Sequence, residues 1–215
     1  LAIVLGKRFG FAKGIMQPHN VPLVLLGAAL LWFGWFGFNV GAEFLNNMEN
    51  VGLITVNTLG ATAAAILGWL AIEKVKEGKA TSIGAASGAV AGLVAITPAC
   101  ANVTPFWALV LGVLAGVLSA LAVDLKFKLG YDDSLDVVGI HLAAGLVGTL
   151  YLGFFAIDTG LFTGGDAGQL LVQTVAAFGV LIYRFVLALV IGVAIEKTIG
   201  CRVKSEDEIA GVDLV

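Results

Sequence analysis

The residues from Val21 to Ala42 read VPLVLLGAALLWFGWFGFNVGA, a run without a single charged side chain. An α-helix rises about 1.5 Å per residue, so a run of this length covers the roughly 30 Å of a bilayer's hydrocarbon core. We therefore expect a transmembrane helix over this range. The rest of the chain decides whether it stands alone or belongs to a bundle.

The composition of the whole chain is that of an integral membrane protein. Of its 215 residues 59% are hydrophobic and only 13% are charged, which excludes an ordinary soluble core. The 29 glycines fit this class, because membrane helices attract one another by close packing of small residues. The net charge of −3 offers no basic surface for nucleic acid. We predict an all-α, polytopic membrane helix bundle.

Further apolar stretches follow the first at regular intervals. One of them, near 81–100, is short and glycine-rich, and Pro98 near its end has no amide hydrogen with which to continue a helix. We assign residues 1–196 to a transmembrane domain and residues 197–215 to a cytoplasmic tail. The six predicted spans lie near 21–42, 51–75, 81–100, 105–125, 135–156 and 168–196.

The basic residues predict the orientation of these spans. Eleven of the twelve lie on alternate connections, and the other connections contain none. By the positive-inside rule these eleven are cytoplasmic, which places both ends of the chain inside the cell. Cys100 and Cys201 then lie on opposite sides of the membrane, so we expect no internal disulfide. The eleven are Lys7, Arg8, Lys13, Lys74, Lys76, Lys79, Lys126, Lys128, Lys197, Arg202 and Lys204.

Arg184, the twelfth basic residue, lies in the middle of the last span. A charge at this depth is costly unless it faces protein, water or a partner. One interpretation is a residue that takes part in conduction or coupling. The other, which we favour, is a structural arginine at a helix or subunit interface, paired with a carboxylate or with carbonyl groups.

His141 lies in the otherwise apolar stretch DVVGIHLAAGLVGTL, residues 136–150. A lone histidine in such a helix can simply form a hydrogen bond with a neighbouring helix and have no further role. Because burial disfavours the charged ring, we expect a neutral imidazole, which can bind a small polar solute without trapping a cation. Asp136 begins this span, and we interpret its carboxylate as the cap of the helix amino terminus.

Two further patterns bear on packing and on the outer end of the first span. Glycines recur every fourth residue over 84–92 and 112–116, which predicts close helix contact. Five aromatic residues within 32–38 are denser than an interfacial belt requires, and indicate a rigid lining that can hold a cation. No HExxH, P-loop, GxSxG or cysteine–histidine cluster is present, so we predict neither an enzyme nor a metal or other cofactor.

Several strings in one order resemble the ammonium transporters of the Amt/MEP/Rh family. They are GKRFGFAKGIMQPHNVPLVLLGAALLWFGWFGFNVG, TAAAILGW, GAVAGLVAITPAC, DVVGIHLAAGLVG and GCRVKSEDEIAGVD, and they cover nearly all of the chain. The resemblance corresponds to the second half of a family member, from about the sixth to the eleventh helix. It implies a homotrimer in the plasma membrane, in which each subunit forms a pore between two inverted repeats of five helices.

The resemblance also implies roles for particular residues. His141 matches the second of two pore histidines, Phe38 matches one of two stacked phenylalanines at the external entrance, and Trp35 lies in the outer vestibule. Ala42 stands where the family pattern has a serine that helps to receive ammonium. The tail matches the cytoplasmic segment that couples subunits and contributes to regulation by PII signalling proteins. Its matching residues are Gly200, Arg202, Glu208, Gly211 and Asp213.

These features together predict transport of ammonium or ammonia, with methylammonium as an analogue, by the carboxy-terminal half of a longer protein. The alternatives are a channel for another small neutral solute such as urea, a sensor of ammonium, and an inactive fragment. The partner histidine, the other gating phenylalanine, and the tryptophan and aspartate that recruit ammonium would all precede Leu1.

Overall fold

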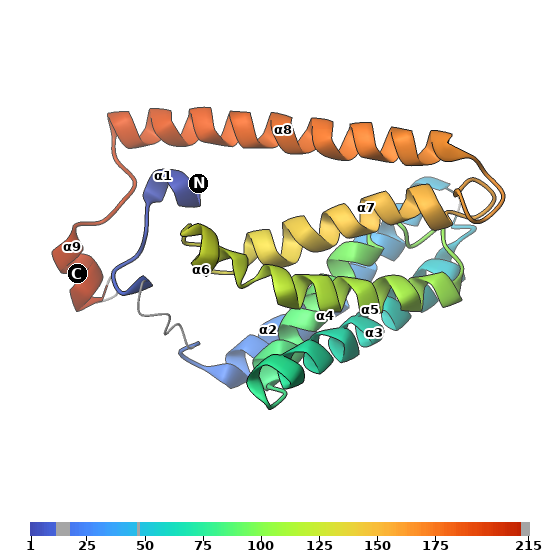
Figure 1. Cartoon of the computed structure of the whole chain (residues 1–215), viewed down its shortest axis with the longest axis horizontal. Coiled ribbons are helices and arrows are strands. Elements are labelled where there is room, and N and C mark those ends of the chain that lie inside the picture. Colours follow the sequence, from blue (N-terminus) through green and yellow to red (C-terminus); the bar gives the residue numbers. More distant parts are fainter. Residues whose placement is uncertain (12–17, 47, 212–215) are drawn as a thin grey trace.

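The computed structural model describes residues 1–11, 18–46 and 48–211, and all regular secondary structure within these ranges is helical. This confirms the predicted all-α fold. The helices in chain order are α1 (Ala2–Leu5), α2 (Val21–Ala42), η2 (Glu43–Asn46), α3 (Val51–Glu77), α4 (Ser82–Ile96), α5 (Pro105–Ala122), α6 (Leu125–Leu129), η3 (Val138–Leu142), α7 (Ala143–Phe155), α8 (Ala167–Thr198) and α9 (Ser205–Ala210) (Figure 1).

Five helical stretches in the described part of the chain are long and apolar enough to cross a membrane. Each corresponds to one of the predicted spans. The helix α2 begins and ends at the two predicted residues. Asn20 caps its start by accepting a hydrogen bond from the amide of Leu23 at 3.0 Å. The five stretches are Val21–Ala42, Val51–Glu77, Pro105–Leu129, Val138–Phe155 and Ala167–Thr198.

The third predicted span forms the shorter helix α4. It starts where Thr81 accepts a hydrogen bond from the amide of Gly84, and it ends at Ile96, four residues before the predicted boundary at Cys100. Residues 97–100 continue as turns around Pro98. At 1.5 Å per residue α4 is about 22 Å long, which is shorter than a typical spanning helix. Whether it completes a sixth crossing stays a prediction.

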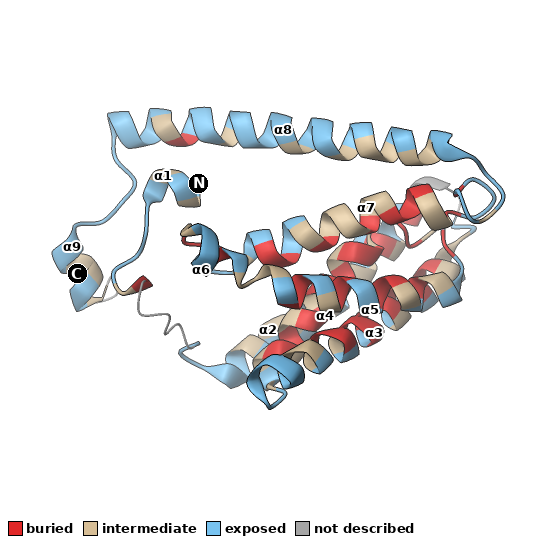
Figure 2. Cartoon of the chain, viewed as in Figure 1, coloured by how far each residue is buried: buried red, intermediate tan, exposed pale blue. Residues whose placement is uncertain are grey.

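The core of the bundle is the tight packing of α3, α4 and α5 (Figure 2). A Cβ atom added at Gly112 would lie 2.2 Å from the carbonyl oxygen of Ala61, and one at Gly116 would lie 2.1 Å from that of Ala65. Only glycine allows backbones to approach this closely. The predicted role of this glycine spacing is confirmed on α5.

The short helices and both described ends of the chain gather at one end of the bundle, where α1, α6 and α9 lie (Figure 1). The described connections 43–46, 48–50, 97–104 and 157–166 lie at the opposite end. Arg8, Lys126 and Arg202 make ion pairs at the first end. Basic residues that the sequence assigned to one side of a membrane thus lie close together, whereas Lys13 lies outside the described residues.

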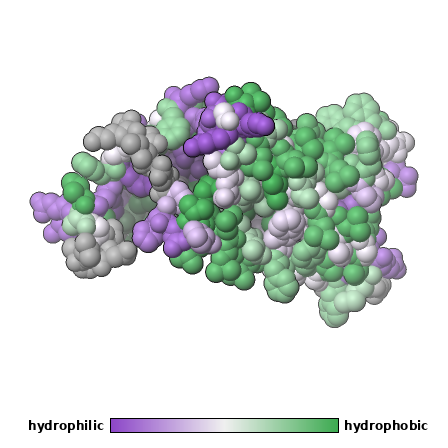
Figure 3. Space-filling view, turned by 90° about the horizontal axis from the view of Figure 1, so that it is seen from below, coloured by the Kyte–Doolittle hydropathy of each residue, from purple (hydrophilic) through white to green (hydrophobic). Residues whose placement is uncertain are grey.

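The surface has the character expected of a protein surrounded by lipid. Hydrophobic residues cover most of the face shown in Figure 3, and hydrophilic residues gather toward one end of it. The helix α8 packs little against the rest of the bundle, since Gly192 is its only buried residue. It runs alongside α7 and meets α1 near its end, as Figure 1 shows.

Candidate functional site

The predicted pore residue His141 lies on η3, a single turn of π-helix that leads directly into α7. Such turns are rare and occur often at functional sites. The side chain of His141 is exposed and lines a cavity of about 570 Å³ between α7 and α8. The cavity is otherwise mostly apolar, and its lining residues are His141, Leu142, Gly145, Leu146, Thr149, Ala176, Ala177, Val180, Leu181, Arg184 and Phe185.

Asp133 holds the start of the helix that carries His141. Its carboxylate oxygens accept hydrogen bonds from the amides of Val137 at 3.0 Å and Val138 at 2.6 Å. A carboxylate at this position satisfies amides that have no partner within the helix, and stabilises the start by about 1 kcal/mol. This corrects the prediction that Asp136 provides the cap.

Asp136 has a different role from the predicted one. Its carboxylate accepts a hydrogen bond from the ammonium group of Lys126 at 2.5 Å, and Lys126 also reaches the carbonyl oxygen of Asp133. The backbone of Asp136 has a φ of 55°, in the left-handed region that aspartate tolerates better than most residues. Burial raises the pKa of its carboxyl, although the neighbouring Lys126 opposes this shift.

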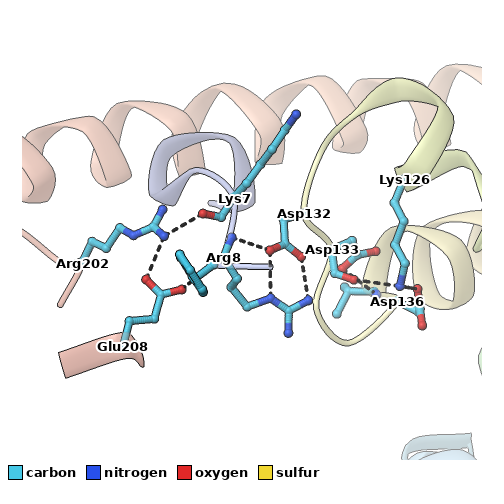
Figure 4. Close-up of polar contacts among 10 residues, drawn as sticks. Lys7, Arg8, Lys126, Asp132, Asp133, Asp136, Arg202 and Glu208 are labelled. Atoms are coloured by element: carbon cyan, nitrogen blue, oxygen red, sulfur yellow. Dashed lines mark hydrogen bonds and ion pairs between the residues drawn. The ribbon is translucent and has the colours of Figure 1, made fainter. Parts of the chain in front are cut away.

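Arg8 binds the residue next to that cap (Figure 4). Its guanidinium donates to both carboxylate oxygens of Asp132, at 2.8 and 2.7 Å, and its amide donates to one of them at 2.7 Å. The side chain of Asp132 is 2% exposed, and that of Arg8 is 41% exposed. The hydrogen bonds from Arg8 hold the pKa of Asp132 below its ordinary value, and they raise the pKa of Arg8.

The predicted tail residues contact the segment that contains Arg8. Glu208 accepts a hydrogen bond from the amide of Phe9 at 2.7 Å and another from Arg202 at 2.9 Å. Arg202 also donates to the carbonyl oxygens of Leu5 and Lys7, at 2.8 and 2.6 Å. The amide of Phe9 is the main cause that lowers the pKa of Glu208. The tail is therefore bonded to the segment between α1 and α2.

The remaining predicted tail residues occupy turns or fall outside the described range. Gly200 has a φ of 72° and Gly211 a φ of 104°, values that favour glycine, and each follows a helix. Asp213 lies outside the described residues. The chain thus uses its tail glycines to end α8 and α9.

The residues predicted for the outer vestibule lie along the second half of α2. The indole of Trp35 donates to the hydroxyl of Thr97 at 2.7 Å, which ties α2 to the turn after α4. The ring of Phe38 lies 6.0 Å from that of Trp35, is tilted by 50°, and is 66% exposed. Ala42 is exposed at the end of the helix. None of the three is among the residues that line the cavity of His141.

The structure therefore brings His141 together with Arg184, a pair that the sequence did not connect. Sequence reasoning also missed Arg8, Asp132 and Asp133. The last two stand side by side just before the helix of His141, and this local acidic pair was the available signal for a cap. Nothing in the sequence links Arg8 to Asp132, because 124 positions separate them.

The sequence of this chain is similar to those of known proteins. A family model described as "Ammonium Transporter Family" matches residues 1–215. The chain is 53% identical over 225 residues to an ammonium transporter of Mycobacterium tuberculosis, covering 99% of this chain and 47% of the relative. It is 40% identical to the ammonium transporter Amt1 of Archaeoglobus fulgidus, covering all of this chain and 55% of the relative. The chain thus spans about half the length of the relatives that it matches.

Solved structures give the same result. A protein titled "Sensor Amt Protein" superimposes with a TM-score of 0.87 at 30% identity, over 99% of this chain and 54% of that protein. Mep2 of Saccharomyces cerevisiae superimposes with a TM-score of 0.83 at 32% identity, over 95% of this chain and 50% of Mep2. The curated relatives are named as transporters and not as enzymes, as the sequence predicted. Since the family model matches every residue from the first to the last, the chain belongs to the Ammonium Transporter Family.

Proposed function

We propose that the complete protein transports ammonium or ammonia across the plasma membrane, and that this chain provides the part of the pathway that contains His141. The observation that carries the proposal is the position of His141 on the wall of an otherwise mostly apolar cavity, in a chain that belongs to this family. The names of the relatives support the choice of solute.

The cavity favours an uncharged form of the solute. An ammonium ion that enters an apolar cavity loses its hydrating water molecules, and the apolar lining offers no hydrogen bonds in their place, so entry is costly. Ammonia carries no net charge and can exchange hydrogen bonds with a neutral imidazole. In the proposed pathway ammonium is recruited at the outer aromatic mouth, near Trp35 and Phe38, and loses its proton before it passes His141. The proton follows a separate or shared route.

The test uses the complete natural protein, reconstituted in liposomes. We expect His141→Ala to abolish or strongly alter the current evoked by ammonium. Leu150→Val, on the same helix but outside the residues that line the cavity, is the matched control and should leave the current nearly unchanged. Unchanged flux and selectivity in the histidine variant would refute the proposed role. Competition by methylammonium but not by urea would separate this function from a channel for another neutral solute.

A second candidate function is ammonium sensing, because one of the structural neighbours is titled a sensor. A sensor would bind ammonium and change conformation with little flux. Measurement of flux in liposomes and of binding by calorimetry on the same preparation separates the two functions. Binding without flux would favour the sensor. The 215-residue chain assayed alone in parallel tests whether it is inactive by itself.

The same proposal includes the topology, the assembly and the regulation of the protein. We propose that both ends of the chain face the cytoplasm, that six helices cross the membrane and that three copies assemble. The hydrogen bonds of Arg202 and Glu208 support a tail that is available for regulation at that face, with a PII signalling protein as its partner. Protease accessibility in oriented vesicles, cross-linking of the assembled protein and pull-down with purified PII protein test these points separately.

A further inference from the structure

The helices α7 and α8 approach each other closely near the start of α8, where a Cβ atom added at Gly153 of α7 would lie 2.5 Å from the Cα of Leu170. Further along, the cavity of His141 separates the two helices. Its lining on α8 runs from Ala176 to Phe185, about 14 Å of helix axis. This cavity is the groove between α7 and α8. Near the other end of α8 the contact is with α1, since a Cβ atom added at Gly192 would lie 2.9 Å from a methyl group of Leu1.

Arg184 lies on the face of α8 that is turned toward this groove. The less exposed positions of α8 recur every three or four residues and form one stripe, which includes Leu170, Thr174, Ala177, Leu181, Ala188 and Gly192. Arg184 falls between Leu181 and Ala188 on that stripe, and it lines the same cavity as His141. It is thus exposed toward the cavity, where a side chain of another helix can reach it.

The environment of Arg184 leaves its charge without compensation in this chain. Among the described residues it has no hydrogen-bond or ion-pair partner. It lies near the middle of α8, about 26 Å from its start and about 21 Å from its end. A guanidinium at this depth is costly unless it faces water, carbonyl groups or an acidic partner.

We propose that Arg184 is one half of an intramembrane ion pair, and that the other half is an aspartate or glutamate carboxylate on an apolar helix that packs against α8 at this groove and leaves His141 on the opposite wall facing the solute path. The helix would come from the part of the natural protein that lies outside these 215 residues. This inference goes beyond the proposed function, because it holds whichever solute crosses.

Three observations select this occupant. The chain spans about half the length of its relatives, so sequence for a further helix exists in proteins of this kind. An apolar helix is the structure that satisfies its own backbone in a single membrane-spanning segment. A carboxylate, unlike water or a carbonyl group, would neutralise the charge of Arg184. A second copy of this chain related by a two-fold axis would instead bring the same groove against itself, with one arginine facing another.

The first experiment measures the thermal stability of the complete protein in detergent. If the ion pair exists, Arg184→Leu leaves a buried carboxylate unpaired, so the Tm should fall by several degrees. Arg184→Lys keeps the charge and should retain most of the stability. Val180→Leu, one turn away on the same groove, is the matched control and should change the Tm little. If Arg184→Leu raises the Tm or leaves it unchanged, no carboxylate faces the arginine and the proposal is overturned.

The second experiment identifies the partner by exchanging charges. Each aspartate and glutamate in the apolar segments outside this chain is changed to arginine, alone and together with Arg184→Glu. One combination should restore the yield of folded protein that both single variants lose. If the two single variants restore folding only when they are co-expressed as separate chains, the carboxylate belongs to a neighbouring subunit, and the proposed helix of the same chain is overturned. An effect of Arg184→Leu that vanishes in nanodiscs of phosphate-free galactolipid would assign the arginine to a lipid phosphate and overturn the proposal. Loss of transport in His141 variants alters none of these outcomes.

Discussion

Arg8 holds both carboxylate oxygens of Asp132 although 124 positions separate the two residues along the chain. The contact joins the segment after α1 to the loop before η3. The next residue in that loop, Asp133, caps the helix of His141. The same segment after α1 also receives the tail through Phe9 and Glu208. A continuous series of polar contacts therefore connects the tail to the helix that carries the candidate pore residue.

Asp132→Asn should destabilise the complete protein by about 2 kcal/mol at pH 7, less than a fully buried pair because Arg8 is 41% exposed. The pKa of Asp132 is lowered in the fold, so its contribution is present above the ordinary carboxyl pKa of about 3.9. It is lost as the pH falls through the lowered value. The Tm difference between wild type and variant should thus persist from pH 7 to 5 and shrink below about pH 4. A difference that is constant with pH would contradict the ion pair.

Asp136 should show the opposite dependence on pH. Burial raises the pKa of this carboxyl, so protonation favours the folded state, and this gain is lost as the pH rises through the raised value. Compared with Asp136→Asn, which does not titrate, the wild type should become relatively more stable as the pH falls. Thermal unfolding of the two proteins from pH 7 to 4 measures the trend. If the wild type instead becomes less stable relative to the variant as the pH falls, the ion pair with Lys126 affects the pKa of Asp136 more strongly than burial does.

The backbone at Asp136 gives a separate prediction. With a φ of 55°, this position disfavours residues other than glycine, asparagine and aspartate. Asp136→Ala should therefore be less stable than Asp136→Asn by about 1–2 kcal/mol, because alanine brings strain and also removes the acceptor for Lys126. Asp136→Gly relieves the strain only and should fall between them. Equal stability of the alanine and asparagine variants would count against both causes.

Gly116→Ala should destabilise the bundle by about 1–3 kcal/mol or more, since the added Cβ atom would lie 2.1 Å from a backbone carbonyl oxygen of α3. The matched control is Gly27→Ala on α2, where nothing lies within 4 Å of the added atom. There the greater helix propensity of alanine leaves stability unchanged or slightly higher. Thermal unfolding compares the two variants, and a similar loss in both would mean that the contact between α3 and α5 is not specific.

Glu208→Gln should loosen the tail, because it weakens the acceptor of both the Phe9 amide and the Arg202 guanidinium. We expect limited proteolysis to cleave the tail of this variant faster than that of the wild type. Glu206→Gln, on the same short helix but exposed, serves as the control. Equal cleavage rates in all three proteins would show that these hydrogen bonds do not hold the tail.

Most of the fold could be predicted because it follows local rules. The bounds of α2 were predicted to the residue, since Asn20 and Pro22 are strong signals for a helix start. The four-residue spacing of Gly112 and Gly116 predicted the close approach of α5 to α3. Hydrophobicity over about 20 residues located the other long helices, to within a few residues at their ends.

The rest could not be predicted because it depends on contacts that no local pattern encodes. The cap was assigned to Asp136 because it stands nearest to the apolar run, whereas the folded loop turns Asp133 toward the helix amides and leaves Asp136 to Lys126. The shared cavity of His141 and Arg184 follows only from the way in which α8 runs alongside α7.

The π-helical turn at Val138–Leu142 has a consequence for insertions and deletions. Such a turn accommodates one residue more than a regular turn, so the helix that follows it keeps its faces whether or not that residue is present. Deleting a single residue there should restore a regular helix and leave the packing of α7 unchanged. Deleting a residue within α7 itself would instead rotate the two parts of the helix against each other by about 100°. This short turn is thus the place in the helix where the number of residues can change with the least effect on packing.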